Sequence, residues 1–319
     1  MIAEGLGPAE PSFVHNESQV VQRQERRVDA GVSDSETSDG SPQDESHAVL
    51  LEEDLGPVRR LTLNRPKRLN ALSHELVEKL SEALARASND VGVRVVVLAA
   101  SGRAFCAGYD LKEEAEHERE RGPLDVAGWQ KALAKDVERM LEIFDHPKPV
   151  IAQVQGYCLA GGCDLMMMCD LAIASEDAMF GEPEIRFGSG VVTMVMPWLI
   201  GARAAKELLF TGEDRVDARE AKRIGLVNRV VPRDELESAT LALAKEIATL
   251  DPVAIAMTKR SINRSLEVSG FREALAANVD IDAVIESAEV PERKEFSRIR
   301  DEQGLKAAIA WRDARFRSS

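Results

Sequence analysis

The 319-residue chain contains 44% hydrophobic residues and carries a formal net charge of −14 at pH 7. This length and composition are those of a globular protein with a sizeable buried core, arranged in one large or two small domains. The acidic balance argues against nucleic acid as a partner, because binding a phosphate backbone requires clustered Lys and Arg.

Residues 1–47 hold half of this charge, with ten acidic against three basic residues, a net charge of −7. The segment is rich in Ser, Gly and Gln and has no sustained apolar period, as in the run Gly31–Gly40. It cannot bury enough apolar surface to offset the entropy lost on ordering. We therefore expect residues 1–47 to be a disordered, solvated acidic tail.

The sequence carries no signal for export, organelle import or membrane insertion. No apolar h-region follows the first methionine, and the tail is too acidic for a typical transit peptide. No apolar run approaches the roughly 18 residues of a membrane span, so we expect a cytoplasmic protein without a membrane partner. The four cysteines have no paired metal-ligand spacing, which favours buried free thiols and no metal site. They are Cys106, Cys158, Cys163 and Cys169.

From residue 48 onward the pattern alternates between strands and helices. The expected strands are the apolar runs 58–63, 93–100, 148–154 and 170–175. Ser73 is expected to cap a helix whose apolar positions continue to Leu84, and another helix is expected to end near Phe144. The charged segment 111–121 is interpreted as a solvated helix, with a mobile segment over a binding site as the alternative.

After Gly201 the pattern is mainly helical, with one short strand expected at 226–231. The expected helices cover 202–210, 218–224, 235–250, 252–266 and 271–288. This order indicates an α/β core over residues 48–200 and a helical region over residues 201–319. The helical region can pack either on a partner subunit or on its own core.

The most informative motif is Gly156–Asp164, where a buried strand is expected to turn into a helix. Because glycine lacks Cβ, Gly161 and Gly162 allow a backbone N–H to approach a ligand oxygen closely. The positive end of the following helix adds to this, so the turn is a candidate oxyanion site. A tight strand-to-helix turn without a ligand is the alternative.

A second turn of small residues, Ala107-Gly108-Tyr109, follows the strand at 93–100. A thioester enolate is held best by two donors, and the backbone amide of Tyr109 is the candidate for the second. Two such turns favour an oxyanion site more than either turn does alone.

Asp164 and Glu184 are the candidate acid and base, because proton transfer next to a carbonyl needs a carboxyl group near the reacting carbon. Asp164 has a simpler possible role as favourable charge at a helix N-terminus. Glu184 has the alternative of a solvated loop carboxylate, and Glu182 is its obvious rival.

Other catalytic classes find little support in the sequence. It has no G-x-S-x-G, H-E-x-x-H or P-loop motif, and no G-x-G-x-x-G after a strand. Of the five histidines, two lie in the tail and three in polar or helix-edge contexts, so no base is placed for a His-based triad. These are His15 and His47, then His74, His117 and His146.

With these motifs in order, the chain resembles the enoyl-CoA hydratase/isomerase (crotonase) superfamily from about Val49 to Phe316. The resemblance is carried by residues 63–72, 104–111, 156–170, 180–185, 211–212, 218–227 and 311–316. It implies an α/β spiral of ββα units followed by C-terminal helices that build trimers, often paired into hexamers. It also implies an acyl-CoA substrate and no cofactor, since coenzyme A enters as the thioester itself.

The resemblance also implies roles for individual residues. Tyr109 and Gly161 would supply the two oxyanion-hole amides, and Asp164 and Glu184 fall where hydratases carry their catalytic carboxylates. One acid would orient water at the β carbon while the other exchanges a proton at the α carbon. The coenzyme A arm would be bordered by Lys67, Arg68, Leu69, Ala107, Asp110, Leu111 and Lys112.

Two departures from the family pattern bear on the reaction. Typical hydratases have Glu at the position of Asp164, and the side chain of Asp is shorter than that of Glu by about 1.5 Å. The Pro- and Gly-rich run after the second acid is replaced by the shorter, more apolar run 187–197, which predicts a reshaped acyl pocket. Asp at the first position also occurs in the dienoyl-CoA isomerase branch, but no further carboxylate lies between Glu184 and Glu207.

The main functional expectation is therefore an enoyl-CoA hydratase, a lyase that adds water to a 2-enoyl-CoA through a stabilised thioester enolate. A second reading is a 3-enoyl-CoA to 2-enoyl-CoA isomerase that relies mainly on Glu184. A third is a non-catalytic acyl-CoA-binding member of the family, motivated by Asp164 and the acidic tail.

Overall fold

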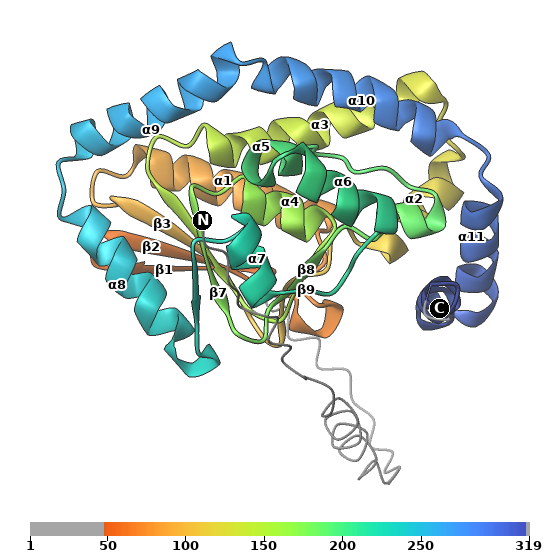
Figure 1. The fold of residues 1–319 in the computed structure, drawn as a ribbon, viewed down its shortest axis with the longest axis horizontal. Coiled ribbons are helices and arrows are strands. Elements are labelled where there is room, and N and C mark those ends of the chain that lie inside the picture. The colour runs from red at the N-terminus through yellow and green to blue at the C-terminus, as the bar shows by residue number, and fades with distance from the viewer. Residues whose placement is uncertain (1–47, 317–319) are drawn as a thin grey trace, which may run out of the picture. The chain divides into compact units, whose positions relative to one another are not determined.

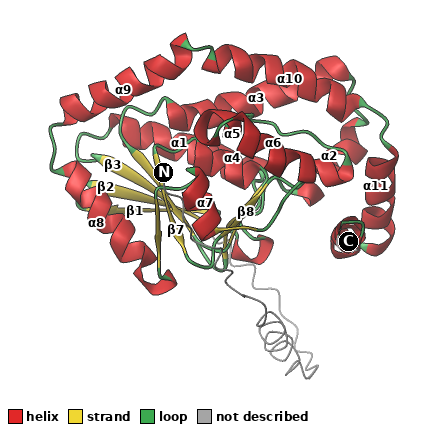
Figure 2. Ribbon diagram, viewed as in Figure 1, coloured by secondary structure: helices red, strands yellow, loops and turns green. Residues whose placement is uncertain are grey.

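The computed structural model describes residues 48–316. The acidic tail expected over residues 1–47 lies outside the described residues. Within the described part, the expected alternation of strands and helices is present, followed by a largely helical C-terminal region. Figure 2 shows strands flanked by helices.

A six-stranded sheet forms the larger of two sheets, in the order β1-β2-β3-β5-β7-β10. Its strands are β1 (Leu50–Leu55), β2 (Val58–Leu63), β3 (Val95–Ala100), β5 (Val150–Val154), β7 (Leu171–Ser175) and β10 (Arg229–Val231). β1 and β2 form an antiparallel hairpin about Gly56, and the other pairs are parallel. β1 had no signal in the sequence because it is an edge strand whose middle residues are exposed and acidic.

A four-stranded second sheet has the order β4-β6-β8-β9. Its strands are β4 (Ala104–Cys106), β6 (Tyr157–Leu159), β8 (Met179–Gly181) and β9 (Val216–Asp217). The chain repeatedly gives one strand to the large sheet and the next to the small sheet before turning into helical structure, as in β3–β4 and β5–β6. This repetition is the ββα spiral expected from the sequence.

Alternate residues of β3 face two different hydrophobic layers. Val96 and Leu98 contribute to the main core, which also contains residues of α1 (His74–Asn89), α3 (Val126–Phe144) and α10 (Phe271–Ser287). Val95 and Val97 contribute to a smaller core that α8 (Leu236–Ala248) covers (Figure 1). The sheet is therefore buried on both faces, as a continuous apolar strand predicts.

The remaining helices connect or cover these layers. They are α2 (Leu111–Arg121), α4 (Gly161–Met167), α5 (Met196–Ile200), α6 (Ala202–Thr211), α7 (Ala218–Ile224), α9 (Pro252–Val268), α11 (Pro291–Gln303) and α12 (Leu305–Ala314). Short 3-10 turns lie at Pro66–Arg68, Glu184–Phe187 and Arg233–Glu235. Among residues 48–316, no helix has the length and hydropathy needed to cross a membrane.

The C-terminal part differs from expectation in three places. The expected strand 226–231 begins only at Arg229, because the N–H groups of Leu226 and Val227 donate to Ala221 O and close helix α7. β10 pairs with β7, so the core sheet extends beyond the expected boundary at residue 200. Helices α11 and α12 were not among the helices expected from the sequence; Phe296 of α11 stacks on Phe187 with ring centroids 5.0 Å apart.

Candidate active site

The two glycine turns lie against each other, although more than fifty residues separate them in the chain. A Cβ added to Gly108 would lie 2.6 Å from Ala160 Cβ and 3.4 Å from Gly161 N. Gly108 has φ of 93°, which favours glycine by itself. The close approach thus depends on glycine and brings the Tyr109 and Gly161 amides into one region.

The hydrogen bonds around the first turn leave the Tyr109 amide free. Leu72 N–H donates to Gly108 O at 2.8 Å, and Asp110 N–H donates to Leu72 O at 3.0 Å. The Tyr109 N–H lies between these bonds, and no acceptor for it occurs within residues 48–316. A free donor at a buried turn is suited to an oxyanion.

The second turn contains a strained residue, Ala160, with φ of 56° and ψ of −137°. Its carbonyl accepts the N–H groups of Cys163 at 2.6 Å and Asp164 at 3.1 Å, which begins helix α4. The Gly161 N–H has no acceptor in the described part of the chain. Non-glycine residues with positive φ are often found where function requires the conformation.

The absence of a side chain at Gly161 also leaves room for the aromatic ring of Tyr109. A Cβ at position 161 would lie 2.6 Å from Tyr109 Cε2, so a larger residue would displace the ring. The Tyr109 hydroxyl is buried without a hydrogen-bond partner among the described residues. Burial raises the pKa of this phenol well above its ordinary value, and the Asp136 and Asp164 carboxylates add to the shift. The hydroxyl therefore stays neutral, and the ring is a wall of the site.

Asp164 lies in the first turn of α4 and is only 1% exposed. Its Oδ2 accepts the N–H of Thr193 at 3.2 Å, while Oδ1 has no partner among residues 48–316. Burial and the nearby Glu184 carboxylate raise the pKa of Asp164 well above its ordinary value. This shift favours the protonated form of Asp164, which is the form that can deliver a proton.

Glu184 begins the short turn after Pro183, and its Oε2 is buried without a partner in the described residues. Burial raises the pKa of Glu184 to about 7, against the lowering effects of its own backbone N–H and of Glu182. Glu184 therefore exists in both protonation states near neutral pH, which suits a general base.

Glu182, the rival of Glu184 in the sequence, is in the same cluster. It is buried, and neither of its carboxyl oxygens accepts a hydrogen bond from residues 48–316. Burial, then the Glu184 and Asp164 carboxylates, raise the pKa of Glu182 well above its ordinary value. Glu182 has the opposite effect on its neighbour and lowers the pKa of Glu184.

A fourth acid, Asp282 on α10, was missed in the sequence. It is buried, and neither carboxyl oxygen has a partner within the described chain. Burial and Glu286 raise the pKa of Asp282 to about 7, and its charge raises the pKa of Asp164 and Glu184 in turn. A signal was available, because Asp282 follows the buried Val279 at helical spacing and so falls on the buried face of α10.

The unusual run 187–197 fills the space between these acids and α10. Asn278 Nδ2 donates to the carbonyls of Val191 at 2.9 Å and Val192 at 3.1 Å. Gly190 N–H donates to Glu286 Oε1 at 2.9 Å, and a Cβ at Gly190 would overlap Asp282 Oδ1. The two departures from the family pattern, Asp164 and the run 187–197, are therefore in contact, because the N–H of Thr193 in this run donates to Asp164.

The two segments expected to border the coenzyme A arm lie side by side. Ala107 N–H donates to Leu69 O at 3.1 Å, and Leu69 adopts a left-handed conformation with φ of 51°. Lys67 and Arg68 are exposed on the preceding 3-10 turn, and Lys112 is exposed at the start of α2. Three cations thus flank a backbone junction beside the Tyr109 turn.

Asp110 and Leu111, also expected at this border, are engaged in holding it. The Asp110 carboxylate accepts Arg65 Nη2 at 2.8 Å and caps α2 through Lys112 N–H at 3.1 Å. Leu111 packs against the small cluster that includes Phe187 and the C-terminal helices. The backbone of these residues remains at the border, while their side chains stabilise the start of α2.

The four cysteines are all free thiols, as expected. Cys106 lies directly under the glycine turn, because a Cβ at Gly162 would be 2.5 Å from Cys106 O. Burial raises the pKa of Cys106 to about 12, so its thiol stays protonated. A protonated, buried thiol is a structural residue and not a nucleophile.

Comparison with known proteins agrees with this geometry. Residues 55–295 match the family model described as enoyl-CoA hydratase/isomerase. The short-chain-enoyl-CoA hydratase of Clostridium acetobutylicum is 38% identical over 231 residues, which cover 70% of this chain and 84% of that protein. The mitochondrial enoyl-CoA hydratase of Pongo abelii is 36% identical over 219 residues, covering 66% and 71%.

Among solved structures, an enoyl-CoA hydratase/isomerase from Xanthobacter autotrophicus superimposes with a TM-score of 0.81 at 45% sequence identity. The superposition covers 85% of this chain and 100% of that one. The spiral α/β fold with a helical C-terminal region, expected from the sequence, is thereby confirmed.

Proposed function

The chain belongs to the enoyl-CoA hydratase/isomerase family, and we propose that it adds water across the double bond of a 2-enoyl-CoA. The observation that carries this proposal is the pairing of two free backbone amides with two buried acids. Tyr109 and Gly161 supply donors without acceptors, and burial raises the pKa of both Asp164 and Glu184.

The amides of Tyr109 and Gly161 bind the thioester carbonyl oxygen. As water adds to the β carbon, negative charge develops on this oxygen, and preformed donors stabilise it without reorganising. Each such donor contributes roughly 2.7 to 4 kcal/mol to the transition state in comparable sites.

Ionised Glu184 takes a proton from water while the water oxygen bonds to the β carbon. The electron pair of the double bond moves into the enolate, and protonated Asp164 delivers its proton to the α carbon. The product has gained one water, Glu184 holds a proton and Asp164 is ionised. Proton transfer from Glu184 to Asp164 restores the starting state.

The direct test is incubation of the full chain with a short 2-enoyl-CoA in ¹⁸O-labelled water, followed by mass spectrometry. A 3-hydroxyacyl-CoA carrying one labelled oxygen is the expected product. If this product is absent and the protein converts a 3-enoyl-CoA instead, the proposed hydration is rejected.

Isomerisation of a 3-enoyl-CoA to a 2-enoyl-CoA is the second candidate, and Asp282 is the observation that favours it. An isomerase moves a proton between two carbons and can rely mainly on Glu184 as the base, whose pKa the Asp282 charge raises. Although the sequence has no carboxylate shortly after Glu184, α10 brings Asp282 against the 187–197 run. Incubation with a 3-enoyl-CoA in deuterated water tests this candidate. Deuterium in a 2-enoyl-CoA product indicates isomerisation, whereas tight binding without deuterium incorporation indicates a protein that binds without catalysis.

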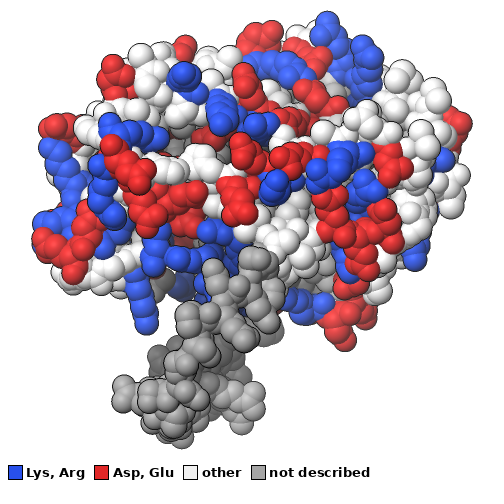
Figure 3. All heavy atoms as spheres, turned by 180° about the vertical axis from the view of Figure 1, so that it is seen from behind, with Lys and Arg blue, Asp and Glu red and all other residues white. Residues whose placement is uncertain are grey.

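No cofactor enters this proposal, since coenzyme A is part of the substrate. The exposed Lys67, Arg68 and Lys112 are suited to its phosphates, which Lys and Arg bind through charge-assisted hydrogen bonds. Acidic and basic side chains are interspersed on the face that Figure 3 shows. Four unpaired cysteines support a reducing compartment such as the cytoplasm.

A homo-oligomer, trimer or hexamer, is also part of the proposal. Helix α9 buries none of its residues in this chain, and it exposes Val253 and Val268 by 66% and 72%. Ile281 and Val284 on α10 are also exposed, and a second copy of the chain would cover such apolar surface. Light scattering coupled to size-exclusion chromatography gives the mass; a monomer at micromolar concentration contradicts this part.

A further inference from the structure

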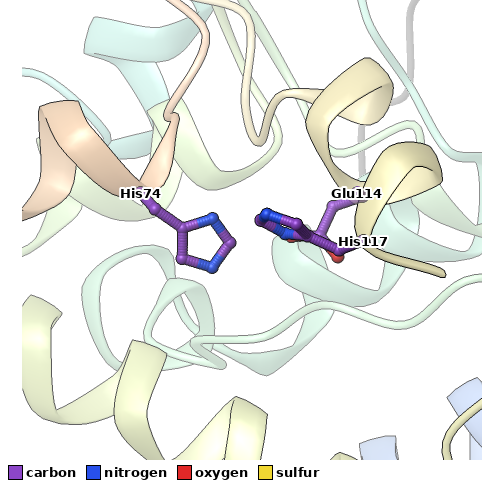
Figure 4. A group of neighbouring side chains, drawn as sticks. All are labelled: His74, Glu114 and His117. Carbon is purple, nitrogen blue, oxygen red and sulfur yellow. The ribbon is translucent and has the colours of Figure 1, made fainter. Parts of the chain in front are cut away.

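Two histidines and a glutamate converge outside the proposed active site. The ligand atoms of His74, Glu114 and His117 all lie within 4.8 Å of one another. Figure 4 shows the His74 ring of one helix facing His117 of another, with Glu114 beside His117. The imidazole rings of His74 and His117 pack edge to face, with centroids 4.6 Å apart.

The three residues come from two elements whose positions are set by the fold. His74 is the first residue of α1, after the cap Ser73. Glu114 and His117 are three residues apart on α2, which places them on the same face of that helix. The cluster therefore joins the start of α1 to the helix that begins directly after Tyr109 and Asp110.

A further carboxylate orients the His74 ring. His74 Nδ1 lies 3.4 Å from Glu113 Oε1, and the His74 backbone N–H donates to Glu113 Oε2 at 3.1 Å. A proton on Nδ1 that points to Glu113 leaves the lone pair of Nε2 free for a cation. Carboxylates hold metal-binding histidines in this way in many proteins.

We propose that His74, Glu114 and His117 bind a divalent transition-metal cation of the Zn²⁺ class. Two imidazoles and one carboxylate are a ligand set that Zn²⁺ accepts, with water completing the coordination. Ligands about 2.1 Å from a tetrahedral ion are about 3.4 Å apart, so the side chains close by roughly an ångström when the cation binds. The side chain of His74 is 56% exposed, which leaves room for this adjustment. Arg121, 3.7 Å from Glu114 Oε2, gives up that contact.

The bound cation clamps α2 to α1. Helix α2 buries only Ala115, so polar contacts, together with the packing of Leu111, hold it against the rest of the chain. These include its cap Asp110 and the Arg119–Asp301 pair at 3.9 Å. Occupancy of the cluster thereby restricts the helix that borders the Tyr109 amide, without contributing a group to the reaction.

The experiment titrates the chelator-treated full chain with Zn²⁺ by calorimetry and with Co²⁺ by visible absorption. One cation per chain is expected, with the Co²⁺ spectrum of mixed nitrogen and oxygen ligands. The variant His74→Ala/His117→Ala weakens binding by more than ~100-fold, and Glu113→Gln weakens it by ~10- to 100-fold. Thermal unfolding of each variant without metal establishes that it is folded.

Two matched controls separate this cluster from other ligands. Glu116→Gln removes the same charge from an exposed position of α2, and His15→Ala/His47→Ala removes two histidines of the acidic tail. Neither change alters binding if the proposal holds. Binding that survives His74→Ala/His117→Ala, or is lost in the tail variant, overturns the site, as does failure of the wild type to bind Zn²⁺ or Co²⁺.

A second measurement tests the clamp. Amide hydrogen exchange of residues 111–121 is expected to slow on addition of Zn²⁺ in the wild type and to stay unchanged in His74→Ala/His117→Ala. Unaltered exchange in a metal-loaded wild type contradicts the clamp. Neither result depends on hydratase activity, so this test stands apart from that of the proposed reaction.

Discussion

The two halves of the proposed oxyanion hole are built alike but buried very differently. Each consists of a strand, a turn that presents one amide, and a helix. All seven residues of α4, which follows the Gly161 turn, are buried, whereas α2, which follows the Tyr109 turn, buries one of its eleven. One amide thus begins a helix of the core, and the other precedes a polar surface helix. This difference favours a rigid Gly161 half, which includes Asp164 on α4, and a more mobile Tyr109 half at the border of the substrate site. We call them the fixed half and the adjustable half.

The largest effect is expected from the acids on the fixed half. Asp164→Asn and Glu184→Gln are each expected to lower kcat/KM for hydration of a short 2-enoyl-CoA by ~10² to 10⁴-fold, because proton transfer is lost while the shape is kept. The matched change Glu118→Gln on exposed α2 should leave kcat/KM close to that of the wild type. Wild-type turnover in both acid variants would remove these residues from the mechanism.

Gly161→Ala is expected to lower kcat by ~10² to 10³-fold, since the added Cβ displaces Tyr109 and disturbs both donors. Gly92→Ala serves as the control, because a Cβ there meets only Asp90 Oδ1 at 3.2 Å, far along the chain from both turns. Steady-state kinetics and thermal unfolding distinguish lost catalysis from lost folding. Equal losses in the two variants would contradict a specific role for Gly161.

The pH dependence of kcat/KM tests the coupling of the acids. The pKa of Glu184 is raised to about 7, and the base must be ionised, so the rate should fall as pH drops below about 7. Asp282→Asn removes a negative charge that raises this pKa and should move the fall to lower pH. Asp280→Asn, at an exposed position of the same helix, should not move it. An unshifted profile in Asp282→Asn would separate α10 from the reaction.

The smallest effect is expected on the adjustable half. Asp110→Ala removes the cap of α2 and the partner of Arg65, and loss of a cap typically costs about 1 kcal/mol. If this free energy appears in substrate binding, KM rises about fivefold with little change in kcat. Asp125→Ala removes the equivalent cap of α3 and should leave KM unchanged. A fall in kcat instead would mean that the Tyr109 half is as rigid as the Gly161 half.

The local features of the site could be predicted from the sequence. The turns at Gly108 and Gly161 were recognisable because close backbone approach requires glycine, and the start of α4 at Gly161 followed from the same motif. The helix capped by Ser73 ends at Asn89, and the strand expected at 93–100 forms as Val95–Ala100. Such features depend on a few neighbouring residues, so they can be predicted without a structure.

The shortest elements and the long-range contacts could not be predicted. The strands of the second sheet have two or three residues, too few to show an alternating pattern. Asp282 reaches the acids from α10, and His74 meets Glu114 and His117 across two helices. These contacts join residues that are far apart in the chain, and only the packing of the layers determines them.

The sequence by itself determined the family and the glycine turns and identified a candidate acid pair, because each rests on residue type and local backbone constraint. The tertiary structure decided how far the pKa of each acid departs from its ordinary value. Burial and the charges that α10 and the 3-10 turn bring beside them raise the pKa of Asp164 and of Glu182 well above the ordinary value, and that of Glu184 to about 7. A carboxyl group in water would ionise at any of these positions; removal from water is what makes them differ.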